Sequence, residues 1–268
     1  MQQATGLVRV AREGAVGSIV LCRPERRNAL KSAMYAEIRD ALHEFQRDDA
    51  VRVVLLRGEG RDFCAGNDIG DFQAFGNVVE KTGIDPRAVV GRSTPSVDLV
   101  HVLMDFDKPL IACVQGNAIG FGATMLLHCD FVIAEPDARL KYPFVDLALV
   151  PEAGSSLLLQ ERAGFLAAAD ILLQARAVDA EAARTMGLVS EVVAAGAAAA
   201  RGAEIAARLA SKPPAALRAT KRLLKRGPEP LAARVDEEFR VIAERSTSAE
   251  ARAVFDGFLS RKAPEARP

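Results

Sequence analysis

Short apolar runs separated by glycine mark the first sixty positions of the chain and predict strands around one helix. The expected strands are residues 7–10, 16–21 and 51–56. A Glu-Gly dipeptide divides the first two, so they predict a β-hairpin. Apolar residues recur at helical spacing between positions 33 and 46, and Ser32 is suited to cap that helix. The opening of the chain therefore predicts two strands, a helix and a third strand.

Two later stretches each place a glycine-rich turn after a strand-like run. The first turn, 63–69, follows the predicted strand at 51–56. The second turn, 116–122, follows an apolar strand at 110–114 and leads into an apolar helical segment at 123–128. Glycine between a strand and a helix lets backbone N–H groups point into a site. The repetition predicts that two separate N–H groups approach one place.

The pattern changes twice along the rest of the chain. Residues 70–95 show weak periodicity with scattered glycine and proline, which predicts an irregular segment over a site. Helix is expected at 97–106 and, after a strand at 131–134, over most of the remainder. The later elements are expected as helices at 157–164, 165–174, 180–186, 196–210, 214–225, 231–244 and 248–260, a short strand at 189–193 and a frayed tail at 261–268. We expect a core over 1–195 that carries the site and a helical region over 196–268.

Composition narrows the class of protein without specifying a reaction. The 268-residue chain is half hydrophobic, enough for a sizeable core, and its 35 basic and 35 acidic residues leave no net charge. That balance argues against nucleic-acid binding, and no stretch resembles a signal peptide or a membrane span, so we expect a cytoplasmic protein without a membrane partner. The four cysteines lack C-x-x-C spacing and predict buried free thiols. Three histidines give little support for a metal site.

One carboxylate, Glu152, stands in a Pro-Glu-Ala-Gly turn after the second glycine turn and the next strand. Backbone donors beside one carboxylate indicate oxyanion binding together with proton transfer. The plainer alternatives are that the glycine turns are only tight connections and that Glu152 is a helix N-terminal carboxylate. Near these turns we also expect solvated or capping carboxylates and one core histidine, namely Asp68, Asp71, Asp146 and His128.

Six motifs, in order along the chain, resemble those of one family. They are RPERRNAL, FCAGNDI, KPLIACVQGNAIGFG, CDFVIAEPDARL, VDLALVPEAGSSLLL and AVDAEAARTMGLVSEVV. Together they resemble the crotonase superfamily of enoyl-CoA hydratases and isomerases over residues 7–259. The resemblance implies an α/β fold, a crotonase-like ββα spiral with a C-terminal helical trimerisation region. It also implies an acyl-CoA thioester as partner and a homotrimer or a hexamer built as a dimer of trimers.

The resemblance assigns a candidate site to particular positions. In the family two backbone N–H groups stabilise a thioester enolate, and here they would belong to Asn67 and Phe121. Further substrate-binding candidates are Ala65, Gly66, Asp68, Ile69, Gly120, Gly122 and Phe144. Candidates for contact with the CoA phosphates are Arg23, Arg26, Arg27 and Lys221. Ordinary solvated charge explains these basic side chains equally well. Coenzyme A is part of the substrate, so the resemblance implies no separate cofactor and no metal.

The acid–base residues separate the branches of this family. Enoyl-CoA hydratases use two glutamates, and the matching positions here hold Thr124 and Phe144. The peroxisomal-type 3-enoyl-CoA to 2-enoyl-CoA isomerases carry F-x-S-G-N-D and P-F…S-P-E-G-x-S-S, which resemble residues 63–68 and 143–156. That resemblance makes Glu152 a proton shuttle, which would take a proton from the carbon next to the thioester and return it two carbons away. Apolar neighbours of Glu152 would favour its protonated form between the two steps.

Three alternatives stay open at the level of sequence. An enoyl-CoA hydratase could use Glu152 alone to handle water. A dehalogenase-like member would place an aspartate nucleophile at position 152 and a tryptophan at position 144, and this chain has neither. A non-catalytic acyl-CoA-binding protein would keep the fold without turnover. No motif specifies the length of the acyl chain or the pathway.

Overall fold

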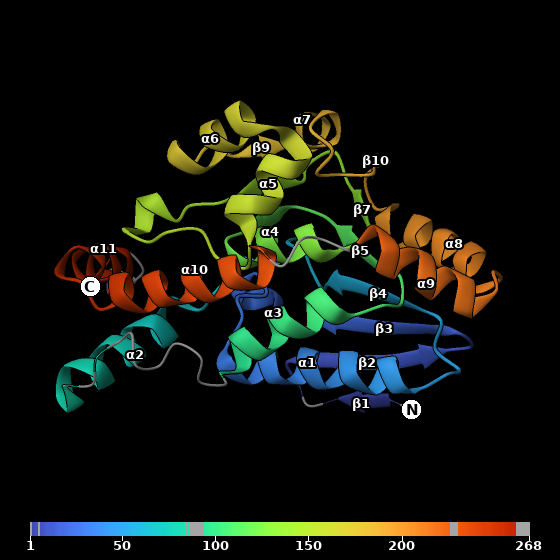
Figure 1. The fold of residues 1–268 in the computed structure, drawn as a ribbon, viewed down its shortest axis with the longest axis horizontal. Coiled ribbons are helices and arrows are strands. Elements are labelled where there is room, and N and C mark those ends of the chain that lie inside the picture. The colour runs from blue at the N-terminus through green and yellow to red at the C-terminus, as the bar shows by residue number, and fades with distance from the viewer. Residues whose placement is uncertain (1, 5, 84, 86–93, 226–229, 261–268) are drawn as a thin grey trace, which may run out of the picture.

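The structure is a computed structural model of the chain, and it describes residues 2–4, 6–83, 85, 94–225 and 230–260. Within these ranges the strands form two sheets (Figure 1). The seven-stranded sheet has the order β1 (Gln2–Ala4), β2 (Val8–Glu13), β3 (Val16–Leu21), β4 (Val53–Gly58), β5 (Leu110–Val114), β7 (Phe131–Ala134) and β10 (Glu191–Val192). The three-stranded sheet has the order β6 (Asn117–Ile119), β8 (Arg139–Lys141) and β9 (Val178–Asp179).

The predicted β-hairpin at the start of the chain is confirmed. β2 and β3 pair antiparallel along their whole length, joined by a turn in which Gly14 has a φ of +55°. From β3 onward the neighbours in the large sheet are parallel. Parallel neighbours need long crossovers, and α1 (Ser32–Arg47) and α3 (Pro95–Asp105) lie in two of them. The crossovers bring the ends of β4 and β5, where the two glycine turns begin, to the same edge of the sheet.

Side chains of the parallel strands alternate between two faces. One set packs against α8 (Ala198–Ala210) and consists of Val53, Ile111, Cys113 and Ile133. The approach of α8 is close, since a Cβ on Gly202 would stand 2.4 Å from Cys113 Sγ. The opposite face shares the main core with α1 and α3, which lie side by side in Figure 1. Both faces of the parallel strands are therefore covered, as such strands require.

Most of the later helices lie within a few residues of their predicted positions. They are α5 (Ser155–Ala163), α6 (Phe165–Leu173), α7 (Ala180–Thr185), α9 (Pro214–Leu224), α10 (Pro230–Ser246) and α11 (Ala249–Ser260). The capping role expected of Ser32 is wrong, because Ser32 is itself the first residue of α1 and no side chain caps that helix. The Ser32 N–H instead donates to the Asp71 carboxylate at 2.9 Å.

The predicted irregular segment at 70–95 is wrong for its first half. Helix α2 (Ile69–Thr82) occupies it, capped by Asp68, whose carboxylate accepts the Gly70 N–H at 3.1 Å. Gly83, with a φ of +63°, ends the helix. A cap and tertiary contacts stabilise a helix whose own sequence pattern is weak. Residues 84 and 86–93 lie outside the described part of the chain.

The C-terminal helices divide between two ends of the molecule. In Figure 1, α8 and α9 lie beside the large sheet, whereas α10 and α11 lie on the other side, next to α2. Two side-chain contacts join α2 to α11. Gln73 donates to Asp256 at 2.9 Å, and Arg252 pairs with Glu80 at 2.8 Å. The predicted frayed tail at 261–268 lies outside the described residues.

The small sheet holds the second glycine turn, and the sequence pattern does not predict it. Its strands are two or three residues long, too short to show a period. Directly after β6, the helix predicted at 123–128 is divided into α4 (Phe121–Thr124) and a 3-10 helix (Met125–His128). The cysteines are free, and Cys64, Cys113 and Cys129 are buried. Of the helices in the described ranges, none has the length and apolar character needed to cross a bilayer.

Candidate active site

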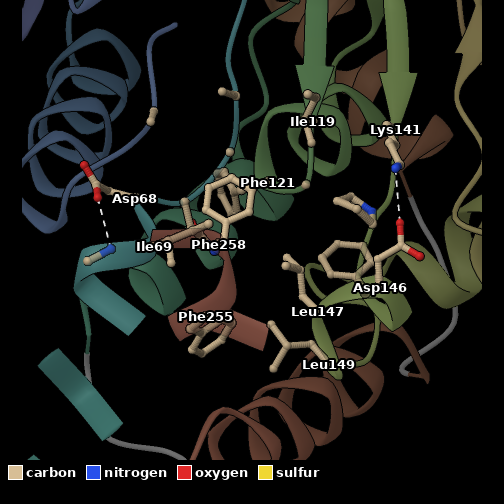
Figure 2. Close-up of a pocket in the computed structure, with 18 of the residues that line it drawn as sticks. Asp68, Ile69, Ile119, Phe121, Lys141, Asp146, Leu147, Leu149, Phe255 and Phe258 are labelled. Atoms are coloured by element: carbon tan, nitrogen blue, oxygen red, sulfur yellow. Dashed lines mark hydrogen bonds and ion pairs between the residues drawn. The ribbon is translucent and has the colours of Figure 1, made fainter. Parts of the chain in front are cut away.

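A cavity of about 1080 Å³ opens where the two glycine turns, β8 and α11 meet. The first turn contributes residues 65–70, the second contributes 119–121, and the segment 143–152 closes a third side. Figure 2 shows apolar side chains from several elements around it, among them Ile69, Phe121, Leu147, Leu149, Phe255 and Phe258. A mostly apolar cavity with a few convergent polar groups is the usual form of a small-molecule site.

The first turn leaves a backbone N–H group beside this cavity without a backbone partner in the described structure. The Leu30 N–H donates to the Gly66 C=O at 2.7 Å, and the Asp68 N–H donates to the Leu30 C=O at 2.9 Å. The Gly66 C=O and the Asn67 N–H belong to one trans peptide and point in opposite directions. The Asn67 N–H therefore points away from Leu30, on the side of the cavity that Asn67 lines. It has no backbone acceptor in the described part of the chain.

The second turn presents an N–H group close to the first turn. The Gly120 C=O accepts the N–H groups of Ala123 and Thr124 at 2.9 Å each. The Phe121 N–H shares a trans peptide with that C=O, so it points out of the first turn of α4. The Gly120 N–H donates to the Lys141 C=O at 2.9 Å and fixes the turn to β8. Gly120 adopts φ +54° and ψ −122°, a conformation open to glycine. Among the described residues, the Phe121 N–H likewise has no backbone acceptor.

The two turns touch where glycine leaves room. A Cβ on Gly66 would stand 2.5 Å from the Ile119 carbonyl oxygen and 3.4 Å from the Phe121 nitrogen. A Cβ on Gly122 would stand 2.4 Å from the Cys64 carbonyl oxygen. An isolated parallel bridge from Cys64 to β6 runs along the same contact. The structure thus brings the two predicted turns together, and side chains at either glycine would push them apart.

Cys64 supports the first turn from behind. Its Sγ accepts the Gly66 N–H at 3.4 Å and donates to the Asn28 C=O at 3.3 Å. The fully buried Asn28 side chain donates in turn to the carbonyl groups of Asp62 and Phe63. These bonds connect the loop after β3 with the turn after β4 and fix the position of Gly66.

Glu152 lines the same cavity and is only 5% exposed. It precedes two residues in the left-handed region, Ala153 at φ +52° and Gly154 at φ +72°. The buried His128 fixes this turn, because its Nε2 donates to the Ala153 C=O at 2.8 Å. α5 begins only at Ser155, so Glu152 is not a first-turn helix carboxylate. His128 is the core histidine expected from the sequence.

His128 makes the stability of the fold depend on pH. Burial, together with the nearby cations Lys225 and Arg162, lowers the pKa of His128 to about 3. An unfolded chain binds a proton at this side chain near pH 6.5, so below that pH the unfolded state is favoured. At pH 5 the cost to the folded state is about 2 kcal/mol. His128→Gln should therefore lose about 2 kcal/mol less unfolding free energy between pH 7 and pH 5, measured by urea denaturation. Equal losses in both proteins would contradict the assignment.

The other acidic side chains that line the cavity are held in ion pairs. Asp68 pairs with Arg23 at 2.8 Å. Burial alone would raise the pKa of Asp68, but the bond to Arg23 holds that pKa below its usual value. Glu25 is exposed, 3.8 Å from Arg23. Asp146 pairs with Lys141 at 3.1 Å (Figure 2). Glu152 is the one buried carboxylate of the cavity as far as the structure describes it.

The two positions at which the resemblance places hydratase glutamates hold side chains without acid–base function. Thr124 is fully buried, its Oγ1 donates to the Phe121 C=O at 3.2 Å, and it does not line the cavity in the described structure. Phe144 does line the cavity and is 5% exposed, so it forms part of the apolar wall. The structure offers no acid or base at either position.

The four basic candidates for the CoA phosphates separate into two pairs. Arg26 and Arg27 are exposed and line the cavity. Arg23 is buried, and its guanidinium donates to a backbone carbonyl and to the Asp68 carboxylate, both at 2.8 Å. Lys221 is 4% exposed and forms an ion pair with Asp130 at 2.6 Å. Neither Arg23 nor Lys221 lines the cavity in the described structure, and each is already paired with a carboxylate, Arg23 with Asp68 and Lys221 with Asp130. The structure therefore supports Arg26 and Arg27 over these two as phosphate contacts.

The sequence does not predict two parts of the cavity wall. α11 contributes Phe255, Phe258 and Leu259, whose spacing of three and four residues is the signal that could have indicated an apolar helix face. The ion pair between Lys141 and Asp146 lies at the edge of the cavity and has no recognisable sequence signal. Within the described ranges, no three His, Cys, Asp or Glu side chains gather so that they could hold a metal ion.

Comparison with known proteins places this geometry in a family. The family profile described as enoyl-CoA hydratase/isomerase matches residues 11–266. The 1,2-epoxyphenylacetyl-CoA isomerase of Escherichia coli (strain K12) is 36% identical over 181 residues, which cover 68% of this chain and 67% of the relative. The enoyl-CoA delta isomerase 2 of Rattus norvegicus is 32% identical over 265 residues, which cover 97% of this chain and 65% of the relative. The 2,3-dehydroadipyl-CoA hydratase of Escherichia coli (strain K12) is 30% identical over 257 residues, which cover 96% of each chain.

Solved structures show the same architecture. OdaA of Pseudomonas aeruginosa superposes with a TM-score of 0.87 at 36% identity, covering 95% of this chain and 99% of that one. An enoyl-CoA hydratase/isomerase from Pseudoalteromonas atlantica T6c superposes with a TM-score of 0.84 at 33% identity, covering 97% of this chain and 100% of that one. The crotonase-like α/β fold is confirmed by these matches. This chain belongs to the enoyl-CoA hydratase/isomerase family.

Proposed function

We propose that this protein converts 3-enoyl-CoA thioesters to 2-enoyl-CoA thioesters, with Glu152 as the proton shuttle. The observation that carries the proposal is one buried carboxylate in the same cavity as two directed backbone N–H groups, those of Asn67 and Phe121. A double-bond shift needs one group that both removes and returns a proton. It needs no second carboxylate to activate water.

The proposed reaction has two proton transfers. The Glu152 carboxylate removes a proton from C2, and the electron pair of the broken C–H bond forms a C1–C2 double bond. The result is a dienolate that carries its negative charge on the thioester oxygen and keeps the C3–C4 double bond. The N–H groups of Asn67 and Phe121 stabilise this oxygen, and one such donor is worth about 3 kcal/mol of barrier. The carboxylic acid of Glu152 then protonates C4, which leaves the double bond between C2 and C3. Glu152 returns to its starting form.

The remaining parts of the substrate also have candidate contacts. Arg26 and Arg27 at the exposed side of the cavity suit the phosphates of CoA. The apolar side chains of α11 and of the 143–149 segment suit the acyl chain. We further expect the assembly that the family resemblance implies, a homotrimer or hexamer. The exposed apolar side chains of α6, namely Phe165, Leu166 and Leu173, form a surface that contact between subunits would bury.

The principal rival is hydration of a 2-enoyl-CoA thioester, because relatives with hydratase names are also similar to this chain. Hydration requires activation of water as well as protonation of C2. The positions of both hydratase glutamates are occupied here by Thr124 and Phe144, and this favours isomerisation.

Two substrates compared in deuterated buffer test the proposal. Mass spectrometry would follow 3-trans-hexenoyl-CoA and crotonyl-CoA with the same enzyme preparation. We expect 2-hexenoyl-CoA from the first and no hydroxyacyl product from the second, and the mass of the product reports how far the shuttled proton exchanges with solvent. Hydroxyacyl-CoA from crotonyl-CoA without isomerisation would overturn the proposal in favour of a hydratase. Binding of both thioesters without turnover would indicate a non-catalytic acyl-CoA-binding protein.

A further inference from the structure

Tyr35 is the side chain at which α1 meets both glycine turns. It is 4% exposed, and its hydroxyl donates a hydrogen bond to the Asn67 side-chain oxygen. Its ring lies edge-on to the ring of Phe121, with centroids 4.8 Å apart and planes at 75°. One side chain thus contacts the two residues whose backbone N–H groups point into the cavity. Neither the chemistry proposed above nor the family motifs use Tyr35.

We infer that Tyr35 is a positioning residue that sets the spacing of the two N–H donors by holding the Asn67 carboxamide with its hydroxyl and the Phe121 ring with its own ring. The inference rests on the proposed role of those N–H groups as the oxyanion hole. An oxyanion hole works because its donors are aimed before charge develops, so side chains that fix their direction contribute to the rate.

The backbone around Asn67 shows why a side-chain bond matters there. Leu30 holds the turn on one side through the Gly66 carbonyl and the Asp68 N–H. Neither of these bonds is made by Asn67 itself. The bond from the Tyr35 hydroxyl to the Asn67 carboxamide holds the Asn67 side chain directly. It therefore adds a side-chain restraint at the residue whose N–H is to be aimed.

Phe121 has a comparable need for support. It begins α4, a helix of four residues that is too short to be rigid by itself. The Thr124 hydroxyl holds the Phe121 carbonyl, and the aromatic contact with Tyr35 holds its side chain. An edge-to-face aromatic pair has a preferred geometry and therefore orients as well as stabilises.

The protonation state of Tyr35 suits this role. Burial raises the pKa of Tyr35 well above its usual value, and the charge of Glu152 raises it further. The hydroxyl therefore stays a hydrogen-bond donor over the whole working pH range.

The test uses the two tyrosines of the chain as a matched pair. Tyr35→Phe keeps the ring against Phe121 and removes only the hydroxyl. Tyr142→Phe removes a second fully buried hydroxyl, which has no partner among the described residues and does not line the cavity. Isotope-edited infrared spectroscopy of bound butyryl-CoA labelled with ¹³C at the thioester carbonyl measures how strongly the oxyanion hole polarises that bond, without any turnover.

We expect the wild-type protein and Tyr142→Phe to lower the carbonyl frequency equally on binding. Tyr35→Phe should give a clearly smaller shift and a kcat lower by about tenfold, with little change in KM. A full shift in Tyr35→Phe would overturn the role of Tyr35 and leave the proposed function intact. The absence of any shift in the wild-type protein would overturn the assignment of the oxyanion hole, and the inference about Tyr35 with it.

A substitution at Asn67 keeps the inference testable even if Tyr35→Phe folds poorly, and where both variants fold it completes a double-mutant cycle. Asn67→Ala removes the side-chain acceptor but leaves its backbone N–H in the chain, so it should reproduce the loss of carbonyl shift. If the hydroxyl acts through the Asn67 carboxamide, the double variant should be about as slow as each single variant. Multiplied effects of the two substitutions would show that they act independently and would overturn the inference.

Discussion

Glu152→Gln is expected to lower kcat/KM for a 3-enoyl-CoA by about 10³-fold or more while leaving the affinity for a saturated acyl-CoA nearly unchanged. Glutamine has the shape of glutamate, so the buried turn that His128 holds can persist. It cannot accept a proton from C2, and the general-base contribution is lost. Turnover of 3-trans-hexenoyl-CoA and isothermal titration with butyryl-CoA measure the two quantities separately.

A glutamate outside the cavity provides the control for this substitution. Glu161 lies on α5, is exposed and does not line the cavity in the described structure. Glu161→Gln changes the net charge by the same amount and should keep the wild-type rate. If Glu152→Gln retained that rate as well, another group would have to be the base and the proposed mechanism would be wrong.

Gly66→Ala is expected to lower kcat/KM by at least about 10²-fold, because it separates the two oxyanion donors. The new Cβ would stand 2.5 Å from the Ile119 carbonyl oxygen, a backbone atom that cannot move without shifting the second turn. The substitution also places alanine at a φ of +84°, which costs roughly 1–2 kcal/mol of stability by itself. Steady-state kinetics and thermal denaturation measure the two effects.

Gly14→Ala separates backbone strain from the clash. Gly14 also has a positive φ, of +55°, but a Cβ there meets nothing within 4 Å among the described residues. We expect it to lose stability and keep activity. Equal activity of Gly66→Ala and Gly14→Ala would mean that the contact between the two turns does not control the chemistry.

The elements with long, regular patterns could be predicted from the sequence. The hairpin of β2 and β3, the strand Leu110–Val114 and the amphipathic α1 all lie close to their expected positions. Their apolar residues repeat often enough to define a period. α2 could not be predicted, because its stability depends on the cap from Asp68 and on contacts with α11, which is almost two hundred residues later.

The candidate site shows the same division between local and long-range information. The two turns could be predicted from the sequence because each needs a residue with a positive φ, and glycine is the residue that adopts it most readily. Gly66 and Gly120 both have a positive φ, and this requirement is local. Arg23 and Lys221 form ion pairs with carboxylates that lie far from them in the sequence. Sequence alone therefore could not distinguish these two side chains from the exposed Arg26 and Arg27. Tyr35 is similar: one tyrosine on an apolar helix face looks like any core residue until Asn67 and Phe121 are placed beside it.

Cys64, which supports the first turn, also bears on how the protein would withstand the product of the proposed reaction. A 2-enoyl thioester is an electrophile that thiolates attack by conjugate addition, and a reactive cysteine beside the cavity would be alkylated during turnover. Burial raises the pKa of the Cys64 thiol to about 12. The thiol is therefore almost entirely protonated near neutral pH, and reaction requires the thiolate. A sulfur that packs tightly behind Gly66 can thus stay chemically inert next to the site at which we propose that an electrophile is formed.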